Sequence, residues 1–305
     1  MRLSQRLGGV LSSLTRRLLL LGASSAALAR AANAAPASRE IRTASREGRI
    51  CLGLNGLTYY AGFYSLLNVL KQGDFIRIVA GGKNYDSNVP PGKPNSAWDG
   101  YLDRDGELTR PLQSGVTHLT RIFFAGSAAS NPEGFNRVGQ QWVLKWDGKA
   151  RDVSISGASS STRRGNRMVW TWGSNTTNMW VTFAGLDSND PPSNIRLCEA
   201  RHEARLETTD VFNPDWLAKV REGSGIIRFM GWQSTNFDRS TLRFSDIPDA
   251  DYHRYGGGTR IPLLRGGMPL TLMSKLANQV QSHPWVCVPT SLGTKKYSAT
   301  LAKAR

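Results

Sequence analysis

Apolar and polar residues alternate with a period of two through much of the segment 49–207. In Gln141–Trp146 and again in Arg167–Trp172, every second residue is large and apolar, so each run would present one apolar face as a strand. Clusters of Gly, Asn, Asp and Pro separate such runs, and this spacing predicts a β-sandwich. The other predicted strands are Ile50–Leu54, Phe75–Ala80, His118–Ala125, Asp152–Ser156, Met179–Leu186 and Asn194–Ala200.

The pattern changes after about residue 207. Asn213 followed by Pro214 is typical of a helix start, because asparagine caps free backbone N–H groups and proline fits the first turn. Pro269–Val280 carries apolar residues at helical spacing. An apolar run that suits a buried strand follows each of these helices, at Gly225–Trp232 and Trp285–Pro289. Tyr60–Lys71 is also helical in character, and Lys295–Arg305 begins a third helix.

Helices and strands that alternate at this spacing predict the start of a β/α barrel or of an open α/β sheet. Two strands cannot close a barrel of eight, so we expect the barrel to be incomplete within residues 208–305. The predicted fold class is therefore mixed. An N-terminal all-β sandwich over residues 49–207 is followed by the first β/α units of an incomplete (β/α) barrel over residues 208–305.

Residues 1–34 have the features of an export signal. A twin-arginine pair at residues 16–17 precedes an apolar run, and Ala-Asn-Ala at residues 32–34 is a cleavage pattern. The run is too short to span a bilayer comfortably, although an organelle transit peptide shares the acid-free composition. We expect a periplasmic or secreted protein, with a linker at residues 35–48 and no transmembrane anchor after the signal is removed.

The amino-acid composition predicts a packed core and a basic protein. Of the 305 residues, 40% are hydrophobic, which excludes a disordered chain. The 39 Lys and Arg against 23 Asp and Glu give a charge of +16; without the five leader arginines, 34 against 23 leave +11. Such a charge suggests a polyanionic partner. The densest basic groups, in segments 163–167 and 295–305, lack the interleaved aromatics of a nucleic-acid platform, so we expect no nucleic-acid partner.

Cysteine and histidine give no sign of a metal or a cofactor. The three cysteines, Cys51, Cys198 and Cys287, cannot form a paired disulfide framework, and each lies in an apolar run. The four histidines are scattered, and no Cys-x-x-Cys or His-Glu-x-x-His pattern occurs. We therefore assign no metal site and no cofactor.

Five stretches, in chain order, carry a resemblance to known proteins. They are CLGLNGLTYYAGFYSLLNVLKQ from Cys51, NPDWLAKVREGSGIIRFMGWQSTN from Asn213, SDIPDAD before Tyr252, GGMPLTLMSKLANQV up to Val280 and HPWVCVP from His283. In order and spacing they resemble a bacterial group of exported proteins described as cellulose-binding or glycoside-hydrolase-like. The resemblance covers most of residues 50–305 and implies a β-sandwich joined to a β/α barrel.

Three departures from that group affect what the resemblance implies. The group has Phe-Met-Asp-Trp where this chain has Phe229–Trp232 with Gly231, so an acid is missing. An acid-rich stretch of the group corresponds to residues 291–297, which hold small residues and two lysines. The group's barrel also continues further, and sugar-cleaving barrels take their catalytic carboxylates from later strands. The resemblance therefore implies a protein without the residues that a hydrolase needs.

Sugar binding needs flat aromatic faces and planar polar groups that bond to hydroxyls. Trp232 and Asn236 would lie just past the C-terminal end of a parallel strand, where barrel ligands bind. Trp98 and Asp99 lie in a loop rich in Pro, Gly and Asn, where a large aromatic has little packing role. The candidate carbohydrate-binding residues are Trp232, Asn236, Arg228, Asn55, Tyr59, Trp98 and Asp99; Tyr60, Trp170, Trp172 and Trp180 are further aromatic candidates, with core packing as the alternative.

The sequence as a whole favours an exported protein that binds a cellulose-like polysaccharide without catalysis. A glycoside hydrolase, or a fragment of one, is the first alternative, and a charge-driven binder of an anionic polymer is the second. Hydrolysis requires two carboxylates about 5–10 Å apart. Asp246, Asp249 and Asp251 cluster on a polar loop, where solvation is the simpler interpretation, so we assign no catalytic residue. The oligomeric state is left open.

Overall fold

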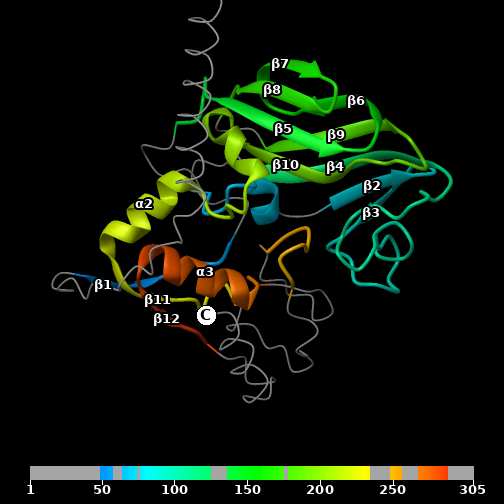
Figure 1. The fold of residues 1–305 in the computed structure, drawn as a ribbon. Helices are drawn as coiled ribbons and strands as arrows, with labels where there is room; N and C mark the ends of the chain where they lie inside the picture. Colours follow the sequence, from blue (N-terminus) through cyan, green and yellow to red (C-terminus); the bar gives the residue numbers. More distant parts are fainter. Residues whose placement is uncertain are drawn as a thin grey trace, which may run out of the picture. The chain divides into compact units, whose positions relative to one another are not determined.

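A computed structural model describes residues 49–57, 64–73, 76–124, 136–174, 178–233, 248–255 and 267–287. Within these ranges the strands form three sheets, two antiparallel and one parallel (Figure 1). The predicted signal peptide (residues 1–34), the linker (35–48) and the third helix (295–305) lie outside the described residues.

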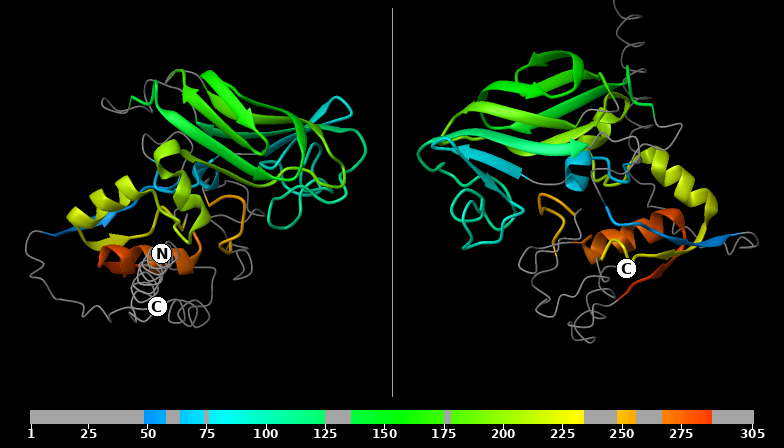
Figure 2. Two further views of the ribbon diagram at one scale, coloured as in Figure 1. Left: turned by 45° about the horizontal axis from the view of Figure 1, so that its top comes forward. Right: turned by 180° about the vertical axis from the view of Figure 1, so that it is seen from behind.

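The two antiparallel sheets lie face to face (Figures 1 and 2). One has the strand order β3-β2-β4-β9-β6 and the other has the order β10-β5-β8-β7. Apolar residues from both sheets form a single core. The strands are β2 (Ile76–Ala80), β3 (Lys83–Asp86), β4 (Val116–Phe124), β5 (Gln141–Asp147), β6 (Ala150–Ile155), β7 (Ala158–Arg164), β8 (Arg167–Trp172), β9 (Met179–Leu186) and β10 (Ser193–Glu199).

Tryptophan fills much of this core. The two runs that alternate with period two form strands β5 and β8, as predicted. Trp142 of β5 is paired in register with Trp170 of β8. The rings of Trp170 and Trp172 are stacked 5.5 Å apart and are almost completely buried. Core packing, the alternative noted for these two tryptophans, is what the structure shows, because alternate residues of a strand share one face.

The third sheet is parallel and short. It has the order β1-β11-β12, with β1 at Ile50–Gly53, β11 at Ser224–Arg228 and β12 at His283–Trp285. Helix α2 (Pro214–Gly223) leads into β11, and helix α3 (Leu270–Val280) precedes β12 (Figure 1). The predicted start of α2 is confirmed, since the Asn213 side chain accepts hydrogen bonds from two backbone N–H groups of the first turn.

The predicted fold class, with an incomplete β/α barrel, is wrong. The described residues are mainly β-sheet, and their helices do not alternate with strands as a barrel requires. β1 was expected in the sandwich, yet it pairs in parallel with β11. The chain from β1 to β11 runs through both antiparallel sheets rather than through one crossover helix. The helical pattern after residue 207 was read correctly, but it belongs to a small sheet whose first strand lies far away in sequence.

Short 3-10 helices occur at Val69–Gln72 (η1) and Ala200–Glu207 (η3). The helix expected over Tyr60–Lys71 is largely absent from its described part: residues 64–68 are not helical, Leu66 forms an isolated β-bridge with Phe212, and only the last residues fall in η1. No helix among the described residues has the length and apolar character needed to cross a membrane.

Candidate functional site

The parallel sheet is covered on one face and open on the other. Ile227 of β11 is buried beneath α2 and α3, together with the partly buried Leu52 of β1. The neighbouring residue Ile226 points to the other face and is 40% exposed. We call this second surface the open face, and its residues are Cys51, Gly53, Ile226, Arg228, His283 and Trp285. Parallel sheets are usually covered on both faces, so an uncovered one indicates a surface for a ligand or partner.

Trp285 is the largest side chain of the open face. It is 51% exposed, and it lies directly opposite Arg228 on the neighbouring strand. The Arg228 guanidinium carbon lies 5.1 Å from the centre of the Trp285 ring, within range of a cation–π contact. One ring face is therefore paired with a cation, while much of the side chain stays accessible to solvent.

Arg228 retains hydrogen-bonding capacity in this position. Its Nη2 donates to the Met230 sulfur at 2.9 Å, which is a weak acceptor. Its Nε is buried and has no partner among the described residues. A ligand with oxygen atoms could therefore accept a hydrogen bond from this guanidinium at little cost, because no internal ion pair would be lost.

Asn55 lies just past the carboxyl end of β1, on the side of Arg228 away from β12. The backbone N–H of Leu54 donates to the Arg228 carbonyl at 3.0 Å, which continues the pairing just past β1. Asn55 follows directly and is exposed. The structure thus brings together two sequence candidates, Asn55 and Arg228, with Trp285, which sequence reasoning missed. Pro284 was a usable signal, because proline within a strand marks an edge, where one side of the strand stays open.

Trp232 does not belong to this surface. Its side chain is 2% exposed and is stacked on Phe212 at 6.2 Å and on Trp216 at 5.9 Å. The ring therefore packs within the core beneath the helices and offers no free face to a sugar.

The loop candidates Trp98 and Asp99 have structural contacts. Trp98 packs against both hydrophobic cores, and its Nε1 donates to the Ser87 carbonyl at 2.8 Å. Both Asp99 carboxylate oxygens accept from the Gly92 backbone N–H at 3.0 Å. Of the further candidates, Trp180 is 37% exposed on β9. Tyr59, Tyr60 and Asn236 lie outside the described residues.

A cluster with metal-ligand chemistry forms where η3 meets the start of α2. Ligand atoms of Glu199, His202 and Asp215 all lie within 4.8 Å of one another. Sequence spacing missed this cluster because its members come from separate elements. Arg201 already binds both carboxylates, at 2.7 Å to Glu199 and 2.6 Å to Asp215. Its positive charge takes the place that a cation would need, so the arrangement acts as an ion-pair cluster joining two elements.

A second charged cluster holds the loop 248–255 to the antiparallel sheets. Lys71 donates to the carbonyls of Ala250, Asp251 and Tyr252, and Arg121 donates to those of Leu70 and His253. Burial, with the nearby charge of Arg121, lowers the pKa of Lys71 to about 8.

Two of the three acids considered for hydrolysis, Asp249 and Asp251, lie in this same loop. Asp249 accepts from the backbone N–H groups of Asp251 and Tyr252, so it shapes a turn. Asp246 lies outside the described residues. These contacts explain a cluster of acids on a polar loop without assigning it a chemical step.

Comparisons with protein-family models, with curated proteins and with solved structures found no significant match to this chain.

Proposed function

We propose that this chain binds a polysaccharide through its open face and does not cleave it. The observation that carries the proposal is Trp285, a half-exposed indole on the uncovered face of a parallel sheet, with Arg228 placed against it. A flat aromatic surface stacks against the C–H face of a pyranose ring, and an adjacent guanidinium donates to ring hydroxyls.

The open face offers both apolar and polar contacts for such a ligand. Trp285 supplies the apolar platform, and Arg228 supplies a guanidinium with no carboxylate partner among the described residues. The exposed His283 and Asn55 add polar groups on either side of Arg228 along the sheet. Small-molecule sites usually combine an apolar surface with a few polar groups in fixed positions.

Export and family membership belong to the same proposal. The leader at residues 1–34 would place the protein in the periplasm or outside the cell, where polysaccharides are found. The resemblance to exported cellulose-binding proteins agrees with a cellulose-like ligand. The hydrolase alternative depended on a β/α barrel, which the described structure does not have.

The charge-driven alternative has weaker support in the described residues. Arg163 donates to three backbone carbonyls and lies over the Trp146 ring. Arg167 forms a bidentate ion pair with Glu203. Two of the three arginines in segment 163–167 are therefore engaged within the protein, and the basic segment 295–305 lies outside the described residues.

The two exposed tryptophans allow a matched test. We expect Trp285→Ala to weaken binding to insoluble cellulose and soluble β-glucans by about tenfold or more, as loss of an aromatic contact at the centre of a site does. Trp180→Ala removes a comparable exposed indole from β9 and should leave binding unchanged. The measurements are pull-down and affinity electrophoresis, with circular dichroism to verify folding.

Two results with these variants would contradict the proposal, and one result with the wild type would also reject it. One is wild-type binding by Trp285→Ala; the other is equal loss in the Trp285 and Trp180 variants, which would point to general surface adhesion. Absence of binding to every glycan in a broad panel would also reject it.

A further inference from the structure

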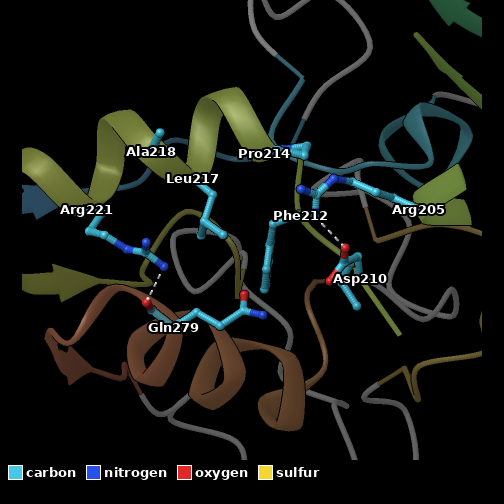
Figure 3. Close-up of a pocket in the computed structure, with 9 residues that line it drawn as sticks. Arg205, Asp210, Phe212, Pro214, Leu217, Ala218, Arg221 and Gln279 are labelled. Carbon is cyan, nitrogen blue, oxygen red and sulfur yellow. Dashed lines mark hydrogen bonds and ion pairs between the residues drawn. The ribbon is translucent and has the colours of Figure 1, made fainter. Parts of the chain in front are cut away.

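A pocket of about 240 Å³ lies between α2 and α3, on the covered side of the parallel sheet. Its walls combine apolar and polar side chains in similar measure, and the apolar part includes Phe212, Pro214, Leu217 and Ala218. Figure 3 shows Phe212 and Leu217 extending into the space between the two helices. Such a space suits a compact apolar group about the size of one aromatic ring.

Two arginines reach this pocket from different elements. Arg221 comes from α2, and its Nη2 donates to the Gln279 backbone carbonyl at 2.9 Å. Arg205 comes from η3 and pairs with Asp210 at 2.8 Å. Figure 3 shows the two guanidinium groups approaching from opposite ends. With two arginines and one aspartate in the lining, the pocket carries a net positive charge.

Arg221 is the more available of the two cations. Among the described residues its side chain has no carboxylate partner, and it donates a hydrogen bond only to the Gln279 backbone carbonyl. A guanidinium satisfied by a single neutral acceptor retains donors for an anion, and Arg binds carboxylates through paired N–H groups.

Gln279 provides a complementary polar group. Its Oε1 is buried and has no hydrogen-bond partner among the described residues. An unsatisfied buried acceptor is unfavourable, so a ligand that brings an O–H or N–H donor would gain from pairing with it. The Gln279 side chain lies along the floor of the pocket, beneath Leu217 and beside Phe212 (Figure 3).

From the apolar lining residues, the available Arg221 guanidinium and the unpaired Gln279 oxygen, we infer that the pocket binds a small organic carboxylate. The apolar body of this ligand carries a hydrogen-bond donor. The carboxylate pairs with Arg221, the apolar body contacts Phe212 and Leu217, and the donor reaches Gln279. This site lies on the helix side of the sheet, away from the open face, and it does not depend on the proposed polysaccharide binding.

Three aromatic probes separate these contributions. 4-Hydroxybenzoate has the carboxylate, the ring and the donor; benzoate lacks the donor, and 4-hydroxybenzamide lacks the charge. Titration calorimetry on the full chain should show saturable binding of 4-hydroxybenzoate. The uncharged amide should bind about tenfold more weakly or worse, because a charge-assisted pair is lost. Benzoate should bind a few-fold more weakly.

Variants assign each contribution to a residue. Arg221→Met should reduce affinity for 4-hydroxybenzoate by about tenfold or more, and Arg221→Lys should retain part of it. Gln279→Leu should abolish the preference for 4-hydroxybenzoate over benzoate while benzoate binding persists. Trp285→Ala is the control and should bind all three probes as the wild type does, which keeps this test separate from that of the open face.

Several outcomes would overturn the inference. These are no saturable binding of either carboxylate, equal affinity for the acid and the amide, or an unchanged hydroxyl preference in Gln279→Leu. If Arg221→Met unfolds, as judged by circular dichroism, the comparison of probes on the wild type and on Gln279→Leu still decides the question.

Discussion

Gly231 shows how a single position constrains the neighbourhood of the open face. A Cβ atom placed there would lie 2.6 Å from the Leu54 carbonyl oxygen and 2.7 Å from the Gly56 nitrogen. Real side chains do not approach backbone atoms so closely, so the position accepts only glycine with this backbone. The physical reason is local: the strand connections after β1 and β11 pass too close together for a side chain between them.

The expected consequence is a loss of stability in Gly231→Ala. The methyl group must push the two connections apart, which typically costs about 1–3 kcal/mol for overpacking. Gly53→Ala is the matched control, because its Cβ would meet no atom within 4 Å and its φ lies in the ordinary range. Urea denaturation of both variants measures the difference. Equal stability of Gly231→Ala and wild type would show that the two connections are not held this close.

At the scale of elements, the parallel sheet is asymmetric. Its covered face packs against α2 and α3, and its open face presents alternate residues of β1, β11 and β12 to solvent. The asymmetry follows from strand geometry, since neighbouring residues point to opposite faces. Cys51 lies on the open face and is exposed, whereas Cys198 lies on β10 of an antiparallel sheet and is buried.

Thiol labelling tests whether the open face is accessible to solvent. We expect maleimide to modify Cys51 rapidly and Cys198 at least about a hundredfold more slowly, because Cys198 must await local opening. Burial also raises the pKa of the Cys198 thiol to about 12, so little thiolate is present. Peptide mass spectrometry over a time course distinguishes the sites. Slow labelling of Cys51 in the native protein would contradict an open face.

At the scale of the whole molecule, a buried cationic cluster links the two hydrophobic cores. His253 lies between them: its ring is 5.7 Å from that of Trp98, and its carbonyl accepts from Arg121. Burial, together with the charges of Arg254 and Arg121, holds the pKa of His253 well below its usual value. The folded protein therefore keeps this imidazole neutral, and its Nε2 has no partner among the described residues.

Acid should therefore weaken the fold. As pH falls through about 6.5, the unfolded chain takes up a proton at this histidine and the folded protein does not. The free energy of unfolding then decreases, by at most about 1.4 kcal/mol per pH unit from this residue, and it is independent of this residue at higher pH. His253→Gln should flatten that slope, and His283→Gln, at an exposed position, should keep it. Denaturation at several pH values tests both; an unchanged slope in His253→Gln would remove this residue as the cause.

Local pattern was enough to predict several elements. The period of two in Gln141–Asp147 and Arg167–Trp172 placed their tryptophans on one face, and Asn213-Pro214 marked the start of α2. These features depend on neighbours within a few residues, so the sequence alone determines them. Of the candidate site, the sequence supplied Asn55 and Arg228. Asn55 directly follows the predicted strand Ile50–Leu54, and Arg228 lies within the predicted strand Gly225–Trp232, so both positions are local properties.

Sheet partners and burial depended on the tertiary structure. Nothing near Ile50 in the sequence shows that β1 pairs with β11 rather than with a sandwich strand. Trp232 ends one predicted apolar run and Trp285 begins the other, yet Trp232 is buried under α2 and Trp285 is exposed on an edge strand. The physical reason is that strand pairing and solvent exposure arise from contacts between distant segments, whereas periodicity reports only which side of its own element a residue occupies.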